Sequence, residues 1–177
     1  MSNQLSVVYS AEQVQQRVRE LAEQISKDYG DRTLHVVSIL DNAFMFAADL
    51  VRQLRCPVVC HFVRCEMKDV IDEQGFERKR IEYTPEVDTA GKEILILDTI
   101  LQSGITHDFL IKRMQFQNPK SIRLATFLDK SVDRKLELVP DYRGFVVNEF
   151  VVGYGLAAGD LYRHLPYIAK PPARSGG

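Results

Sequence analysis

The sequence predicts an α/β domain built on a mainly parallel sheet with helices on its faces. Short apolar runs of strand length alternate with longer segments in which apolar residues recur at helical spacing, and this order joins parallel strands through crossover helices. A chain of 177 residues suffices for one such domain. We expect residues 1–170 to form it and residues 171–177, mostly proline, serine and glycine, to be a flexible tail.

The individual elements follow from local patterns. Ser10, with Gln13 three residues later, forms a capping box, and apolar residues at helical spacing predict a helix from there to Gly30. Further helices are expected at 43–54 and 106–116, and strands at 35–40, 58–65, 93–97, 121–128 and 145–152. The polar stretch 66–89 is expected to be a mobile hairpin or a lid, with Arg78-Lys79-Arg80 in a solvated loop.

Composition and charge exclude several classes of function. The net charge of −1 argues against general binding to nucleic acid or to an anionic membrane. No apolar segment approaches the length of about 18 residues that a membrane span needs, and residues 1–10 lack a signal-peptide pattern, which indicates a cytoplasmic protein. Cys56, Cys60 and Cys65 crowd one strand beside His61. A metal site is one interpretation, but cysteines buried as small hydrophobic residues are the better one, so we predict no metal ligand.

The most informative segment is 94–106, where four apolar residues precede an acid and then a Ser-Gly-x-Thr loop that opens a helix. Unpaired N–H groups and the positive end of the helix dipole make such a helix start a site for anions. Gly104 permits close approach to the backbone, and the Ser103 and Thr106 hydroxyls are further donors. We predict that Ser103, Gly104, Ile105 and Thr106 bind a phosphate; the alternative is an ordinary βα turn in which Thr106 caps the helix.

Two charged residues fall at the same edge, because ligands of parallel sheets bind outside the carboxyl ends of the strands. Asp98 ends the strand before the loop, and its carboxylate can accept two hydrogen bonds from a sugar or cap a nearby turn. Lys130 follows the next strand and can donate to a carbonyl oxygen on a ring ligand. The alternative is a solvated lysine paired with Asp129 or Asp133.

Two residues nearer the C-terminus complete the set of candidates. Phe150 precedes a Gly-Tyr-Gly turn, and its ring can stack on a planar heterocycle or belong to the core. Arg163 can hold an anion through two parallel N–H groups, or it can be a surface arginine. The residues alone leave both pairs of alternatives open.

Taken together, these residues resemble the hypoxanthine-guanine phosphoribosyltransferase family along most of the chain. The most specific matches are 128–130, 149–155 and 162–167, and 43–50 is similar to the family's first crossover helix. The resemblance implies the type I phosphoribosyltransferase fold, with a small C-terminal hood that has elements near both chain ends. It also implies a reaction in which a purine base displaces pyrophosphate from magnesium-bound phosphoribosyl pyrophosphate.

The resemblance implies roles on the sugar and phosphate side. The loop 103–106 matches the loop that holds the 5′-phosphate, and Arg163 matches an arginine that contacts pyrophosphate. Asp98 and Thr99 stand at the family's acidic pair, which makes them candidates for contact with the ribose.

On the base side, Lys130 matches the lysine that reads the exocyclic oxygen of the purine. Phe150 matches the aromatic residue that stacks on the base, and Val151 the residue whose backbone meets the base edge. The implied partner is therefore a purine base or a purine nucleotide.

The departures from the family pattern fall on the chemistry. Gln102 stands where the family has an aspartate that acts as a base near the purine N7, and an amide cannot take up that proton. Ala157 replaces an aspartate associated with magnesium, and Asp41 replaces a lysine in a pyrophosphate site, where it would repel the leaving group. We therefore assign no catalytic residue and no metal ligand, and expect Mg²⁺ only if the protein is active.

These observations favour a protein that binds purine 5′-nucleotides such as IMP or GMP and is a weak or inactive transferase. The alternative is an active purine salvage enzyme that makes IMP or GMP and releases pyrophosphate. A third possibility is a non-catalytic subunit that assembles with an active relative. Family members generally form dimers or tetramers, so we expect a homo-oligomer.

Overall fold

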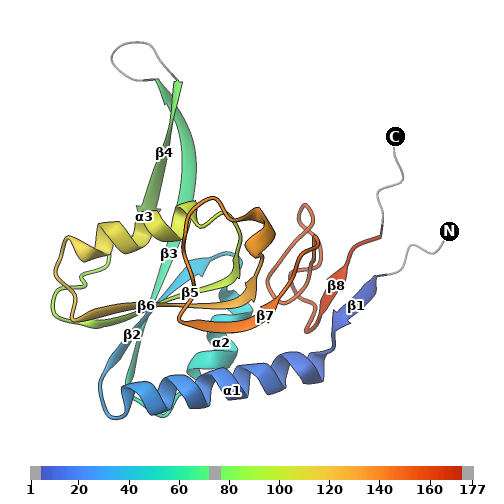
Figure 1. Cartoon of the computed structure of the whole chain (residues 1–177), viewed down its shortest axis with the longest axis horizontal. Helices are drawn as coiled ribbons and strands as arrows, with labels where there is room; N and C mark the ends of the chain where they lie inside the picture. The colour runs from blue at the N-terminus through green and yellow to red at the C-terminus, as the bar shows by residue number, and fades with distance from the viewer. Residues whose placement is uncertain (1–4, 72–76, 173–177) are drawn as a thin grey trace.

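The computed structural model describes residues 5–71 and 77–172. A six-stranded sheet in the order β4-β3-β2-β5-β6-β7 forms its centre, and β1 pairs with β8 in a separate two-stranded sheet (Figure 1). The strands are β1 (Ser6–Tyr9), β2 (Leu34–Leu40), β3 (Val58–Ile71), β4 (Glu77–Thr84), β5 (Glu93–Leu101), β6 (Ser121–Asp129), β7 (Tyr142–Val146) and β8 (Ile168–Lys170). The helices are α1 (Ala11–Tyr29), α2 (Phe44–Val51) and α3 (Ile105–Gln115), with a 3₁₀ turn at Ser131–Asp133.

The sheet is mainly parallel. β2 pairs in parallel with β3 and β5, and β6 pairs in parallel with β5 and β7, while β4 alone runs antiparallel to its neighbour β3. Parallel neighbours bring their carboxyl ends to one edge. The prediction of an α/β domain with a mainly parallel sheet is confirmed.

Helices cover both faces of this sheet, with α1 and α2 on one side and α3 on the other (Figure 1). The predicted capping box starts α1: the N–H of Gln13 donates to Ser10 Oγ, and the N–H of Ser10 donates to Gln13 Oε1. The apolar stripe that includes Val14, Val18 and Leu21 is fully buried against the sheet. Among the described residues, no helix is both long and apolar enough to cross a membrane.

Three sequence-based expectations differ from the structure. The basic run 78–80 lies in β4 and pairs with residues 68–70 of β3, so it is part of a long hairpin and not a solvated loop. The tip of that hairpin, 72–76, lies outside the described residues, as do 173–177 of the expected tail. The last strand of the sheet is β7, which ends at Val146, several residues before the strand end predicted at 152. Cys60 is exposed, because alternate residues of a strand point to opposite faces of the sheet.

Both ends of the chain form the hood. β1 and β8 pair antiparallel with Ser6 opposite Lys170, and Ala169 also bridges to Val152. Strands of four and three residues are too short for a periodic pattern, which explains why the sequence did not predict them. β8 therefore lies between β1 and the backbone at Val152 and holds that segment in place.

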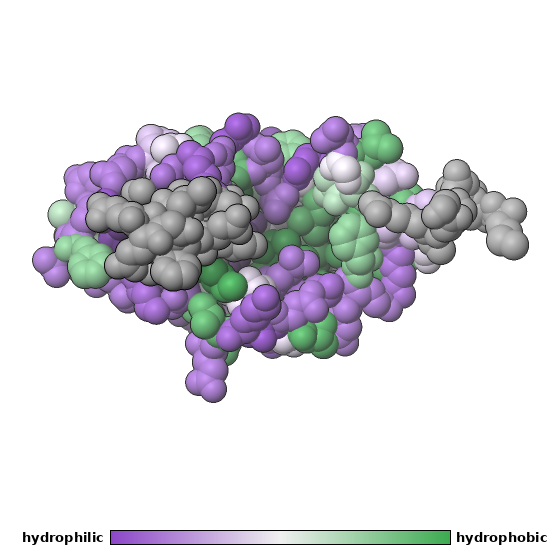
Figure 2. Space-filling view, turned by 90° about the horizontal axis from the view of Figure 1, so that it is seen from above, coloured by the Kyte–Doolittle hydropathy of each residue, from purple (hydrophilic) through white to green (hydrophobic). Residues whose placement is uncertain are grey.

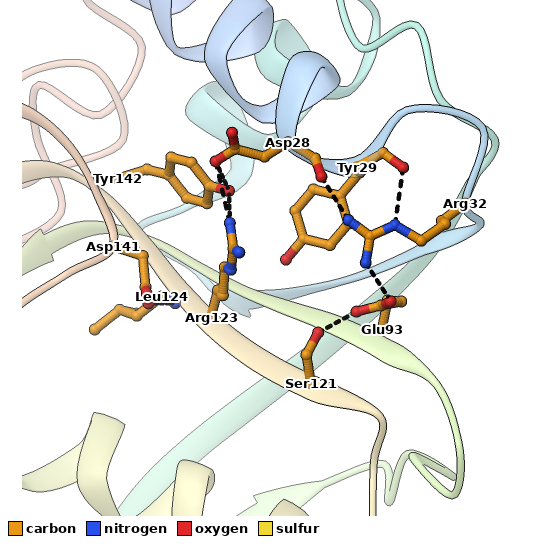
Figure 3. A network of polar contacts seen from close by, with 9 residues as sticks. All are labelled: Asp28, Tyr29, Arg32, Glu93, Ser121, Arg123, Leu124, Asp141 and Tyr142. Carbon is orange, nitrogen blue, oxygen red and sulfur yellow. Dashed lines mark hydrogen bonds and ion pairs between the residues drawn. The ribbon is translucent and has the colours of Figure 1, made fainter.

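A network of polar contacts lies at the amino ends of the central strands (Figure 3). Glu93 is buried at the start of β5 and accepts from Arg32 and from the Ser121 hydroxyl. Arg123 donates to the Tyr142 hydroxyl, and its guanidinium lies 5.8 Å from the centre of that ring. These contacts tie the turn after α1, β5, β6 and β7 together at the amino ends of the parallel strands.

The main core depends on Phe127, which is fully buried and packs its ring against Phe46, Phe145 and Tyr154. We expect Phe127→Ala to lower the free energy of unfolding by about 3–5 kcal/mol, because the lost ring leaves a cavity. Phe116→Ala is the matched control: that ring is 83% exposed, and the change should stay within about 0.5 kcal/mol. Urea unfolding measures both variants, and equal losses would contradict this account of the core.

Candidate functional site

Segments from several elements meet at the carboxyl ends of the parallel strands. They enclose two adjoining cavities, of about 220 Å³ and about 200 Å³, and Asn42, Ile100 and Gln102 line both. The loop cavity is further lined by Cys65, Asp98, Ser103, Gly104, Thr106 and His107. The aromatic cavity is further lined by Glu149, Phe150, Val151, Ala157, Gly159 and Arg163. Figure 2 shows a hollow near the middle of the upper face, with apolar side chains inside it and polar side chains along its rims.

The loop after β5 presents backbone donors to the loop cavity. Gly104 adopts a left-handed conformation, with φ of 82°, and is the N-cap of α3. In the described part of the chain, the N–H groups of Gly104, Thr106 and His107 have no backbone partner, while the N–H of Ile105 donates to Ser103 Oγ. The N-cap is Gly104 and Thr106 is already inside the helix, so the alternative in which Thr106 is the cap is wrong. Free N–H groups at a helix start form an arrangement that binds anions.

A buried acid and a histidine lie beside this loop. Asp98 Oδ2 and His107 Nε2 are 3.0 Å apart, and both side chains are more than 90% buried. The other oxygen of Asp98 accepts the N–H of Thr99 at 2.7 Å. Cys65 lies in the same cavity, where burial and the Asp98 carboxylate raise the pKa of its thiol to about 11. The sequence had singled out Asp98 but not its partner His107.

Asn42 lines both cavities and is hydrogen-bonded to residues on either side of it. Its backbone oxygen accepts the Thr99 hydroxyl at 2.7 Å, and its side-chain oxygen accepts Arg163 Nη1 at 2.7 Å. Arg163 Nη1 also donates to the backbone oxygen of Gly155 at 2.7 Å. Thr99 is fully buried, holds the turn after β2 through this bond and lines neither cavity, so the ribose contact assigned to it stays a prediction. Arg163 is anchored within the site and is not a free surface arginine.

A second arginine, Arg134, holds the loop after β5 without lining either cavity, and the sequence did not indicate it. Arg134 Nε donates to the backbone oxygen of Gln102 at 2.7 Å, and its guanidinium forms an ion pair with Asp129. Only 13% of the Arg134 side chain is exposed. Several of its partners are backbone carbonyl groups, which every residue has. The sequence therefore gives no sign of these contacts.

The aromatic cavity contains the residues predicted on the base side, except Lys130. Phe150 is 56% exposed at this cavity, so the alternative that places it in the core is wrong. Val151 is buried, and its backbone N–H and C=O have no hydrogen-bond partner among the described residues. Lys130 lines neither cavity; it pairs with Asp133 at 2.8 Å, but only 12% of its side chain is exposed, so the alternative of a solvated lysine holds only for the pairing. Gln102 lies where the two cavities meet.

Comparison with known proteins defines the class to which this fold and site belong. Residues 5–158 match the family model described as the phosphoribosyl transferase domain. The chain is 34% identical to hypoxanthine-guanine phosphoribosyltransferase of Bacillus subtilis over 92% of this chain and 90% of that protein. It is 32% identical to hypoxanthine phosphoribosyltransferase of Salmonella typhimurium over 96% and 97%. The chain belongs to the hypoxanthine-guanine phosphoribosyltransferase family.

Solved structures agree with this assignment. A crystal structure of a hypoxanthine-guanine phosphoribosyltransferase from Bacillus anthracis superposes with a TM-score of 0.82 at 32% identity, covering 97% of this chain and 100% of that one. The chain also matches the bifunctional protein TilS/HprT of Listeria monocytogenes at 34% identity, where it spans 25% of that longer protein.

The contact between Gly155 and the turn after β2 is testable. A Cβ at Gly155 would lie 2.0 Å from the backbone oxygen of Asn42, whereas a Cβ at Gly159 would meet nothing within 4 Å, although both glycines have positive φ. We expect Gly159→Ala to lower the melting temperature by about 2–4 °C, the effect of about 1 kcal/mol of backbone strain in a chain of this size. Gly155→Ala should lower it by at least twice as much. Similar melting temperatures in calorimetry would contradict the close contact.

Proposed function

We propose that this protein binds purine 5′-nucleotides such as IMP or GMP and is a weak or inactive transferase. The observation that carries the proposal is Gln102 at the junction of the two cavities, where a base and a sugar phosphate would meet. An amide can donate and accept hydrogen bonds, but it cannot act as a general base, and the absence of such a group typically costs about 10²–10⁴ in rate.

Recognition of a nucleotide is supported on both sides of Gln102. The open N–H groups around Ser103, Gly104 and Thr106 suit a 5′-phosphate. The exposed ring of Phe150 suits stacking on a purine, and the unpaired backbone groups of Val151 suit hydrogen bonds to the base edge. We retain Lys130 as a candidate for the exocyclic oxygen only if its ion pair with Asp133 opens.

The groups present do not fit the Mg²⁺ that enzymes of this family use. This ion prefers oxygen ligands, carboxylates above all. Among the described residues, no cluster of three His, Cys, Asp or Glu side chains could hold a metal. Ala157 lines the aromatic cavity without any donor, and both oxygens of Asp98 are already hydrogen-bonded. We therefore derive no step through a metal.

Asp41 is expected to repel a bound pyrophosphate less than the sequence suggested, because its charge is paired. Its carboxylate pairs with Arg64 at 2.8 Å, and both side chains are more than half exposed. The pair partly offsets the repulsion that Asp41 alone would exert on an anion, and an exposed pair of this kind contributes at most about 1 kcal/mol. The main argument against efficient transfer therefore comes from Gln102 and Ala157.

The second candidate function is an active salvage enzyme. It is favoured by identity of 32–34% to bacterial proteins named as hypoxanthine or hypoxanthine-guanine phosphoribosyltransferases over nearly the whole chain. A transferase of this kind would form IMP or GMP from a purine base. Measured activity separates the two candidates.

Nucleotide binding tests the first candidate. Titration calorimetry should detect IMP and GMP at concentrations well below millimolar. Phe150→Ala should weaken binding by about fivefold to a hundredfold, because stacking of a base on an aromatic ring contributes about 1–3 kcal/mol. Phe116→Ala removes an exposed ring at the C-cap of α3 and should leave the affinity unchanged. The absence of binding at millimolar nucleotide would refute the proposal.

Product formation tests the second candidate. With hypoxanthine or guanine, phosphoribosyl pyrophosphate and Mg²⁺, we expect turnover well below the usual enzymatic range of about 1–10³ s⁻¹. Gln102→Asp should raise the rate without restoring that range, since Ala157 remains. Gln102→Glu, which places the carboxylate one methylene further out, is the matched control. Wild-type turnover within the usual range would favour the active enzyme.

A further inference from the structure

We propose that His107, oriented by Asp98, is the cationic partner of the nucleotide phosphate and takes up one proton when the phosphate binds. The inference rests on the proposed nucleotide binding and names a residue and a proton that the family resemblance does not include.

The position of His107 is the first support. It lies in the first turn of α3, is 5% exposed, and lines the loop cavity together with Ser103, Gly104 and Thr106. Its Nε2 contacts Asp98 Oδ2 at 3.0 Å, while Nδ1 has no hydrogen-bond partner in the described part of the chain. The fully buried polar side-chain atoms that lack a partner there are the hydroxyls of Tyr29 and Tyr83. Nδ1 of His107 is not among them, and the residue lines the loop cavity.

The carboxylate determines what Nδ1 presents to a ligand. Asp98 is an acceptor when ionised, so Nε2 carries the hydrogen in this contact. A neutral His107 would then direct the lone pair of Nδ1 at the phosphate, which is repulsive. Uptake of one proton from solvent turns Nδ1 into a donor, and the resulting imidazolium lies between two anions. A hydrogen bond of this charged kind is about twice as strong as a neutral one.

No other residue lining the loop cavity can become the cation. Among the described residues that line it there is no Lys or Arg, and the other titratable groups are Asp98 from β5 and Cys65 from β3. Cys65 stays a neutral thiol near neutral pH, because burial raises its pKa to about 11. Arg134 lies behind the loop and is paired with Asp129. Phosphate binding would otherwise place a dianion near Asp98 with only neutral donors, the backbone N–H groups and the Ser103 and Thr106 hydroxyls, to offset the repulsion.

Calorimetry in several buffers measures the proton directly. At pH 8.0 the phosphate is a dianion, because its second pKa is about 6, so proton uptake reports on the protein. The binding enthalpy of IMP to the wild-type protein should vary with the ionisation enthalpy of the buffer, with a slope of about one proton per nucleotide. Inosine, which lacks the phosphate, should give a slope near zero.

Variants assign the proton to one residue. His107→Gln can still donate to Asp98 but cannot be protonated; it should abolish the slope and weaken IMP binding by about tenfold. Asp98→Asn should reduce the slope as well. His164→Gln, at an exposed histidine outside both cavities, should retain the wild-type slope and affinity.

The outcomes separate this inference from the proposed function. If wild-type protein binds no IMP, the proposed function fails and this inference fails with it. If IMP binds without a buffer-dependent enthalpy, or if His107→Gln keeps both the slope and the affinity, the inference alone is overturned.

Discussion

Asn42 connects the three parts of the chain that form the site. Its backbone oxygen receives the Thr99 hydroxyl from β5, its side chain receives Arg163 from the C-terminal segment, and its backbone lies too close to Gly155 for any side chain there. The turn after β2, the end of β5 and the Gly-Tyr-Gly turn are therefore held at fixed separations. Because both cavities share Asn42, a displacement of this one residue would change the shape of both.

Most charged side chains in and around the site are already paired with other groups of the protein. Arg163 and Arg134 are bound to protein oxygens, and Lys130 is paired with Asp133. Asp98 is satisfied by His107 and a backbone N–H. Apart from the contact proposed for His107, most ligand contacts would therefore come from backbone dipoles, amides and an aromatic ring, groups that recognise shape and hydrogen-bonding pattern.

The parallel sheet and the loop that opens α3 could be predicted because each has a local signature. Apolar runs mark the central strands, and Gly104 after Ser103 marks the helix start. The roles of His107 and Arg134 could not be predicted, because their partners lie 9 residues away and on backbone carbonyls respectively. The burial of Thr99 could not be predicted for a related reason: burial of a strand residue depends on its neighbours in the sheet, which a single sequence does not identify.

The neutral side chain at the junction has a consequence for how long a ligand would stay. A carboxylate beside a nucleotide adds electrostatic repulsion to the bound product and so speeds its departure. The Gln102 amide exerts no such force, and it can rotate to match either a donor or an acceptor on the base. A pocket of this design favours slow release and sustained occupancy by a bound nucleotide.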